Sequence, residues 1–178
     1  MQRWLQTNRP DIRFCCPLLT PYPNECAKSL EKIVETALDS DEPIYLAGSS
    51  LGGFWATYLV AKYHLPAVLI NPAVDALNLL PNYINQPLAN YHTDDTYCLQ
   101  EDDLVALSRY DTPIIQHTAA YWLLVQTGDE TLDYRLAVEK YRQCRQTIEP
   151  GGDHSFQGFE RFYADIMMFF ETTYDRLR

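Results

Sequence analysis

The stretch that decides the fold is residues 44–63, IYLAGSSLGGFWATYLVAKY. It begins with a short apolar run typical of a strand, passes through glycines and serines, and continues with the composition of a helix. In a GxSxG turn between a strand and a helix, the serine takes a positive φ, and the two elements approach too closely for side chains two residues to either side. Gly48 and Gly52 meet this requirement around Ser50, so the sequence predicts a nucleophile elbow with Ser50 at its tip.

Ser49 is the weaker candidate for the tip of this turn, because its flanking positions are Ala47 and Leu51. With Ser50 at the tip, the backbone N–H of Leu51 lies in the first turn of the helix, where we expect it to donate to an anionic intermediate. A plainer interpretation is a glycine-rich turn that cradles a phosphate. Other residues must decide between the two, since a serine hydroxyl is a poor nucleophile unless a base takes its proton.

A carboxylate and a histidine follow Ser50 in the chain order that such a site requires, each after a later strand. We predict strands at Trp122–Gln126 and Gln146–Glu149, and Asp129 comes just after the first and His154 just after the second. Because the carboxyl ends of parallel strands share one edge of a sheet, these side chains are expected to meet there. We therefore predict a triad in which Ser50 is the nucleophile, His154 the base and Asp129 the acid that orients the base.

The carboxylate has three rivals. Glu130 takes the place of Asp129 if the loop is shifted by one residue. Asp153 adjoins His154, but the side chains of neighbouring residues diverge, so we interpret it as a residue that shapes the turn. Asp133 lies at the start of a predicted helix, where a carboxylate is more simply a cap or a dipole partner.

The other histidines are expected to have ordinary structural positions. His64 ends a predicted helix and is interpreted as a charge partner of the helix C-terminus. For His92 and His117 we expect surface placement rather than a place in a pocket. The apolar and aromatic candidates for a substrate pocket are Leu79, Leu80, Tyr83 and Tyr91.

Across the whole chain, short apolar runs alternate with longer amphipathic ones, which predicts an α/β domain with a mainly parallel sheet and helices on both faces. The remaining predicted strands are Ile12–Cys16, Ile44–Ala47 and Ala67–Ile70. The predicted helices are Glu25–Asp39 with Asn24 as its N-cap, Leu51–His64, Leu132–Gln143 and Phe159–Leu177. Residues 75–118 are rich in Asn, Asp, Pro and Tyr and are expected to form a lid-like insertion in a single domain of residues 1–178, with one helix at Asp102–Arg109.

The composition argues against several classes of partner. Asp and Glu number 24 against 14 Lys and Arg, giving a net charge of -10 at pH 7, and no cluster of basic residues interrupts this balance. Nucleic acid and anionic membranes are held by concentrated positive charge, so neither is an expected partner. The apolar runs are far shorter than the roughly 20 residues that span a bilayer, and the N-terminal region lacks a secretory apolar segment, so we expect a soluble, cytoplasmic protein.

The five cysteines form an odd set without a CxxC pair, which indicates neither a disulfide framework nor a zinc site. We expect reduced thiols that are mostly buried. Oligomeric state is left open by the sequence.

Five segments resemble the YqiA and YcfP group of small bacterial esterases within the α/β hydrolases. They are PLLTPYP at Pro17–Pro23, GSSLGGFWATYL at Gly48–Leu59, LINPAV at Leu69–Val74, QTGDETLDYRLA at Gln126–Ala137 and GGDHSFQGFE at Gly151–Glu160. The resemblance implies hydrolysis of short acyl esters by Ser50, Asp129 and His154, without a metal or an organic cofactor. Thioesterase or peptidase activity with the same triad remains an alternative.

The chain departs from that group at its beginning. Members start with a strand leading into a His-Gly-Phe loop, which supplies the second oxyanion N–H, and nothing similar precedes Ile12. By analogy with the fold, that strand lies between those corresponding to Ile12–Cys16 and Ile44–Ala47. We therefore expect a chain that begins one element late, within the first crossover helix, and lacks this strand and its oxyanion loop. A catalytically impaired binding protein of the same fold is accordingly a second alternative.

Overall fold

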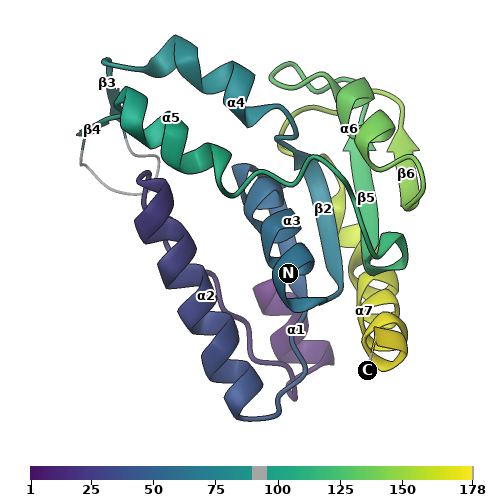
Figure 1. Ribbon diagram of the computed structural model, residues 1–178. Coiled ribbons are helices and arrows are strands. Elements are labelled where there is room, and N and C mark those ends of the chain that lie inside the picture. The colour runs from purple at the N-terminus through teal and green to yellow at the C-terminus, as the bar shows by residue number, and fades with distance from the viewer. Residues whose placement is uncertain (90–95, 178) are drawn as a thin grey trace.

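A four-stranded parallel sheet forms the centre of the protein (Figure 1). The computed structural model describes residues 1–89 and 96–177. The strands are β1 (Leu46–Ser50), β2 (Ala67–Pro72), β5 (Tyr121–Gln126) and β6 (Arg145–Glu149), and they lie in the order β1-β2-β5-β6. All three neighbouring pairs are parallel, as the alternation of apolar and amphipathic runs predicted.

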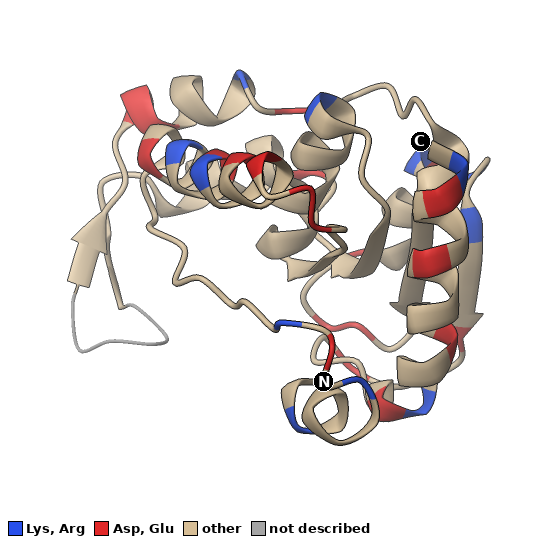
Figure 2. Cartoon of the chain, turned by 90° about the horizontal axis from the view of Figure 1, so that it is seen from below, with Lys and Arg blue, Asp and Glu red and all other residues tan. Residues whose placement is uncertain are grey.

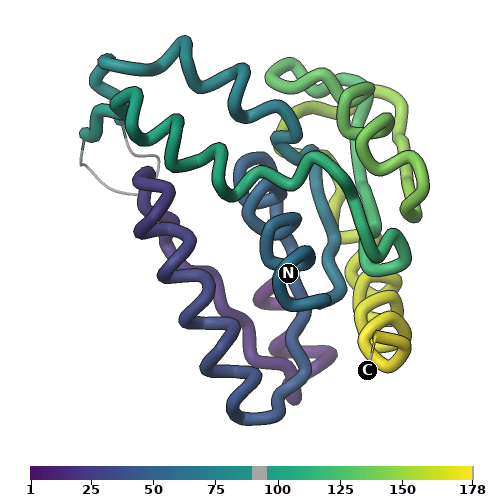
Figure 3. The backbone as a smooth tube through the Cα atoms, in the orientation of Figure 1, coloured from purple at the N-terminus to yellow at the C-terminus, as the bar shows by residue number. Residues whose placement is uncertain are grey.

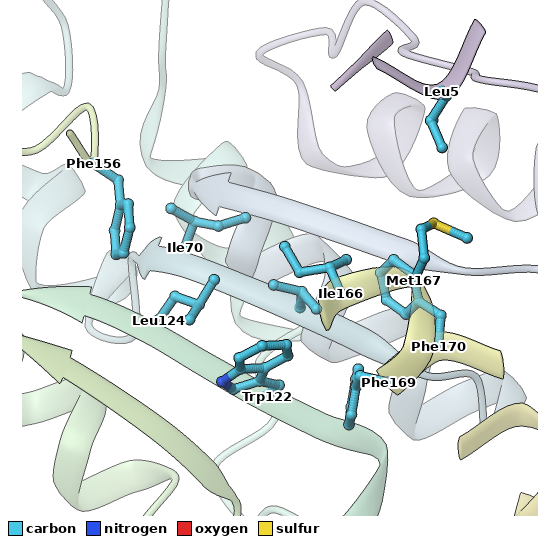
Figure 4. Packing of buried hydrophobic residues seen from close by; sticks show 10 residues of the cluster. Leu5, Ile70, Trp122, Leu124, Phe156, Ile166, Met167, Phe169 and Phe170 are labelled. Carbon is cyan, nitrogen blue, oxygen red and sulfur yellow. The ribbon is translucent and has the colours of Figure 1, made fainter. Parts of the chain in front are cut away.

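Helices cover both faces of this sheet, because successive residues of β2 and β5 point to opposite faces and are apolar on both. On one face lie α1 (Gln2–Asn8) and α7 (Tyr163–Leu177), which pack against even-numbered strand residues such as Ile70 and Leu124 (Figure 4). On the other face lie α3 (Leu51–Tyr63) and α6 (Tyr134–Lys140), which pack against odd-numbered ones. Each fully buried Leu or Val side chain of this kind contributes about 1.5–3 kcal/mol of transfer free energy.

The helix α2 (Pro23–Asp39) begins earlier than predicted, and Tyr22 rather than Asn24 occupies its N-cap position. Proline is favoured in the first helical turn because its missing N–H has no partner there in any case. Asn24 instead accepts a hydrogen bond from the Tyr110 hydroxyl at 2.9 Å.

The segment between β2 and β5 leaves the carboxyl end of β2, runs outward through α4 and returns through α5 to the start of β5 (Figures 1 and 3). Its described elements are α4 (Ala76–Leu79), η1 (Leu80–Tyr83), β3 (Pro87–Ala89), β4 (Thr96–Cys98), α5 (Glu101–Ser108) and η2 (Thr118–Ala120). The predicted helix at Asp102–Arg109 is therefore confirmed within one residue, and it carries a capping box between Gln100 and Asp103. That the segment acts as a lid stays a prediction.

Two strand predictions were wrong, one in the existence of the strand and the other in its bounds. Residues Ile12–Cys16 form no strand, because an extended segment becomes a strand only when another strand pairs with it, and none in the described ranges does so. The strand predicted at Ile44–Ala47 is displaced and continues as β1 to Ser50.

The strand β1 lies at the edge of the sheet and pairs with β2 only, among the described residues. Ala47 and Ser49 are exposed, although every residue of the neighbouring β2 is buried. The expectation that another strand belongs beside β1 stays a prediction.

The five cysteines are all free, and only Cys26 is buried. The expectation of mostly buried thiols was therefore wrong, since Cys15 and Cys16 are exposed in the unpaired segment where a strand had been expected. Burial raises the pKa of the Cys26 thiol to about 12.

Basic residues are scattered among acidic ones rather than gathered on one element (Figure 2). Within residues 1–89 and 96–177, no helix is both long enough and apolar enough to cross a bilayer.

Candidate active site

The turn from β1 into α3 has the geometry of a nucleophile elbow. Ser50 stands between the two elements with φ 52° and ψ -124°, a strained conformation for a residue other than glycine. A Cβ added to Gly48 would lie 2.5 Å from the carbonyl carbon of Gly52 and closer still to its oxygen, so only glycine fits at position 48.

The second glycine that the geometry requires was misidentified. A Cβ added to Gly52 meets nothing within 4 Å, whereas one added to Gly53 would lie 2.5 Å from the Cβ of Pro72. The backbone of Gly52 in α3 lies against Gly48 of β1, and the α-carbon of Gly53 lies against Pro72 of β2. Close packing therefore demands glycine at Gly48 and Gly53, and not at Gly52.

Three side chains from distant parts of the sequence meet at the carboxyl edge of the sheet. The Nε2 atom of His154 lies 3.0 Å from the Oγ atom of Ser50. The Nδ1 atom of His154 lies 3.0 and 2.9 Å from the two carboxylate oxygens of Asp129. The hydroxyl, imidazole and carboxylate thus form one hydrogen-bonded chain, with the imidazole in the middle.

The Asp129 carboxylate is held firmly by its own loop. Its side chain is 1% exposed, and its Oδ1 atom accepts hydrogen bonds from the backbone N–H groups of Thr131 and Leu132, both at 2.9 Å. These donors and the imidazole fix both the position and the orientation of the carboxylate. The His154 side chain is 23% exposed and so remains open to solvent beside Ser50.

A family model matches residues 1–171, and its description is "Uncharacterised protein family (UPF0227)". The chain belongs to UPF0227. This is the YqiA and YcfP-like family, so the resemblance seen in the sequence is confirmed.

The UPF0227 chain is also similar in structure to solved α/β hydrolases. The esterase domain of a Rhodothermus marinus protein is 12% identical, with 84% of this chain and 68% of that chain covered and a TM-score of 0.59. Est1E from Butyrivibrio proteoclasticus is 15% identical, with 87% and 69% covered and a TM-score of 0.56. A monoacylglycerol lipase from Paleococcus ferrophilus is 18% identical, with 86% and 77% covered and a TM-score of 0.56. At these identities the similarity shows the α/β-hydrolase fold, as predicted.

The rival residues all lie outside the hydrogen-bonded chain. Ser49 is exposed on β1, whereas Ser50 contacts the imidazole. Glu130 accepts a hydrogen bond from the backbone N–H of His154 at 3.0 Å, whereas the ring of His154 contacts Asp129. Asp153 accepts from the backbone of Ser155 at 2.9 Å and so shapes the turn, as predicted.

Asp133 caps α6 by accepting from the backbone N–H of Arg135 at 3.0 Å, which confirms the prediction for this carboxylate. The guanidinium of Arg135 lies beside it and lowers the pKa of the Asp133 carboxyl.

His64 and His117 lie at the amino ends of β2 and β5, away from the carboxyl edge where Ser50, His154 and Asp129 meet. His64 takes the C-cap position of α3, and its exposed ring lies against the exposed ring of His117, with 4.2 Å between the ring centroids. His92 lies outside the described residues, as does Tyr91. Of the other pocket candidates, Leu79 and Tyr83 are exposed and Leu80 is half-buried.

Leu51 is the first residue of α3, and the residue is 38% exposed. The backbone N–H at this position of a helix has no partner within the helix. Its role as an oxyanion donor stays a prediction.

Sequence reasoning missed two buried amides, Asn71 and Gln126, which stand at the carboxyl ends of β2 and β5. Asn71 donates to the backbone carbonyls of Asp153 and His154, and Gln126 accepts from the backbone N–H of Asp153. A signal was present in the sequence, because each is the only polar residue of an otherwise apolar stretch and lies last or next to last in its strand. Buried polar groups in such places are nearly always hydrogen-bonded.

Proposed function

We propose that this protein is a serine esterase that hydrolyses short acyl esters through Ser50, His154 and Asp129. One observation carries the proposal, namely the continuous contact from Ser50 Oγ through the imidazole to the Asp129 carboxylate, at 3.0 Å on the serine side and 2.9 Å on the aspartate side. These distances are within the range in which a base takes a proton from a nucleophile. The α/β-hydrolase fold supports the proposal further.

In the first half of the proposed reaction, Ser50 Oγ attacks the ester carbonyl carbon while His154 Nε2 takes the hydroxyl proton. The carbonyl oxygen becomes an oxyanion, which the backbone N–H of Leu51 stabilises. The tetrahedral intermediate then breaks its bond to the alcohol oxygen, and His154 gives that oxygen the proton. The products are the free alcohol and an acyl ester on Ser50.

In the second half, His154 removes a proton from water, and the resulting hydroxide attacks the acyl carbon. The bond to Ser50 Oγ breaks, the proton returns to Ser50, and the carboxylic acid leaves. Nδ1–H donates to the Asp129 carboxylate throughout, which keeps the neutral imidazole in the tautomer whose Nε2 accepts a proton and stabilises the imidazolium formed when it has done so.

A fluorophosphonate probe tests the proposal directly, because it labels only an activated serine. We expect covalent labelling at Ser50 in the wild-type protein and hydrolysis of a short-chain p-nitrophenyl ester. Ser50→Ala should abolish labelling and lower hydrolysis by orders of magnitude, about 10⁶-fold by triad precedent. Ser49→Ala is the matched control and should keep both. Equal losses in the two variants, or none in Ser50→Ala, contradict the assignment.

A second candidate is a binding protein that keeps the fold without the chemistry. It is favoured by the pairing of β1, which has β2 as its one neighbour in the described part of the chain, whereas the family resemblance predicts a second neighbouring strand that carries the second oxyanion donor. One oxyanion donor accounts for about 10² to 10³ in rate where it has been measured. A folded wild-type protein that takes no label at Ser50 supports this candidate over the esterase.

A further inference from the structure

Asn71 occupies an unusual position at the end of β2. Its backbone has φ 39°, in the left-handed region, where asparagine is one of the few side chains tolerated. The residue is 2% exposed. Its side chain faces across the sheet toward the loop that carries His154.

The Asn71 amide uses both of its polar atoms. Its Nδ2 atom donates to the carbonyl oxygens of Asp153 and His154, both at 3.0 Å. Its Oδ1 atom accepts from the backbone N–H of Gln126 at 3.0 Å. One side chain thereby joins the ends of β2 and β5 to the backbone of His154 itself.

Gln126 holds the same loop from β5. It is 3% exposed, and its Oε1 atom accepts from the backbone N–H groups of Asp153 and Gln157, at 3.3 and 2.8 Å. Its Nε2 atom donates to the Gln157 carbonyl at 2.8 Å and to the Glu149 carboxylate at 3.0 Å. All four hydrogen-bonding positions of this amide are thus satisfied.

The loop that carries His154 depends on these amides for its place. Residues 150–157 form no helix or strand, and positive φ occurs at Gly151, Gly152 and Phe156. A Cβ added to Gly152 would overlap the Gln126 amide, so the loop backbone lies directly against that side chain. Beyond the amides, the buried ring of Phe156 fixes the far end of the loop in the core.

We propose that Asn71 is a positioning residue, which acts with Gln126 to hold the His154 imidazole in line between Ser50 and Asp129. Asn71 contacts the backbone carbonyl of His154 and none of the reacting atoms. The inference deepens the proposed esterase function, and its kinetic test rests on that function. A misplacement of about 1 Å at a catalytic group lowers the rate by about 10²-fold, so a looser loop should lower the rate of hydrolysis strongly.

Asn71→Asp is the sharpest variant, since it keeps size and shape while replacing the Nδ2 donor by an oxygen. That oxygen would face two carbonyl oxygens now 3.0 Å from Nδ2, so attraction becomes repulsion. Asn71→Gly is the second variant, because glycine accepts the positive φ without strain and removes the amide altogether. Tyr141→Phe is the stability control, as it removes a buried hydrogen bond to Thr57 on the other face of the sheet.

For folded Asn71→Asp or Asn71→Gly, we expect kcat to fall about 10²-fold or more with KM changed by less than about threefold. Tyr141→Phe should lower the melting temperature while leaving kcat unchanged. Folded Asn71 variants with wild-type kcat overturn the proposal, and so does a loss of kcat in Tyr141→Phe as large as theirs. A rise in KM alone also overturns it, because that indicates a substrate contact instead.

Proton NMR provides a readout that is independent of esterase activity. The imidazole Nδ1–H that donates to a carboxylate gives a resolved downfield resonance, which we expect in the wild-type protein and in Tyr141→Phe. In the Asn71 variants it should broaden or disappear as the imidazole leaves Asp129. If the wild-type protein hydrolyses no ester, the proposed function fails, while this resonance still decides the positioning role. Its persistence unchanged in the Asn71 variants refutes that role.

Discussion

Replacing Gly48 with alanine tests the close approach on which the elbow depends. The new Cβ would start 2.5 Å from the Gly52 carbonyl carbon, whereas ordinary contact begins at 3.4 Å. The end of β1 and the first turn of α3 must therefore separate by roughly 1 Å, and such overpacking typically costs about 1–3 kcal/mol of folding free energy. Ser50 lies between these segments, so a displacement of that size should also lower the rate of hydrolysis about 10²-fold.

Gly52→Ala is the matched control within the same motif, because its Cβ meets no atom within 4 Å. Alanine is favoured over glycine in a helix by about 0.5–1 kcal/mol, so this variant should be as stable as the wild type or slightly more stable. Urea unfolding gives the stability of each variant, and kcat/KM for a p-nitrophenyl ester gives its activity. If Gly52→Ala loses as much as Gly48→Ala, or if Gly48→Ala behaves like the wild type, the steric reasoning is refuted.

Three further outcomes are expected. Asp129→Asn should keep the fold but lower kcat by about 10³- to 10⁴-fold, whereas Asp153→Asn should lower kcat only slightly. The reverse result would mean that Asp129 is not the partner of His154. The guanidinium of Arg161 and the Gln126 amide lower the pKa of the Glu149 carboxyl. The ionised Glu149 carboxylate therefore contributes its full share of stability above the unfolded-state pKa of about 4.3. This share is lost as the pH falls through the lower pKa of the folded state. When the free energy of unfolding is measured as the pH is lowered, Glu149→Gln should therefore lose less of it below a pH of about 4 than the wild type does. Equal losses in the two proteins would argue against the ion pair between Glu149 and Arg161. Asp133→Ala should lower the free energy of unfolding in urea by about 1 kcal/mol, because the N-cap of α6 is lost. An unchanged free energy of unfolding would show that the cap does not stabilise the protein.

Much of the geometry of the candidate site could be predicted because its parts are local. The turn around Ser50 needs a glycine at position 48 for reasons confined to a few neighbouring residues, and Asp129 and His154 each follow a strand whose apolar run is plain in the sequence. Strand ends in a parallel sheet share an edge, so local assignments were enough to bring together Ser50 and His154, which are 104 residues apart.

What could not be predicted was decided by contacts between segments. Whether Gly52 or Gly53 must be glycine depends on the distance to Pro72 in another strand. Ile12–Cys16 has the composition of a strand but no strand to pair with, and pairing, unlike composition, is a property of the assembled sheet.

The sequence by itself determined the four strands of the central sheet with their crossover helices, the elbow at Ser50 and the two loops that follow β5 and β6, because hydrophobic periodicity and turn chemistry are carried by adjacent residues. Only the tertiary structure decided that Asp129 rather than Glu130 reaches the imidazole, and that the amide of Asn71 supports the histidine loop. Hydrogen bonds have strict limits of distance and angle, and a shift of one residue in a loop exchanges one carboxylate for another. The folded backbone sets these directions, and no local pattern in the chain encodes them.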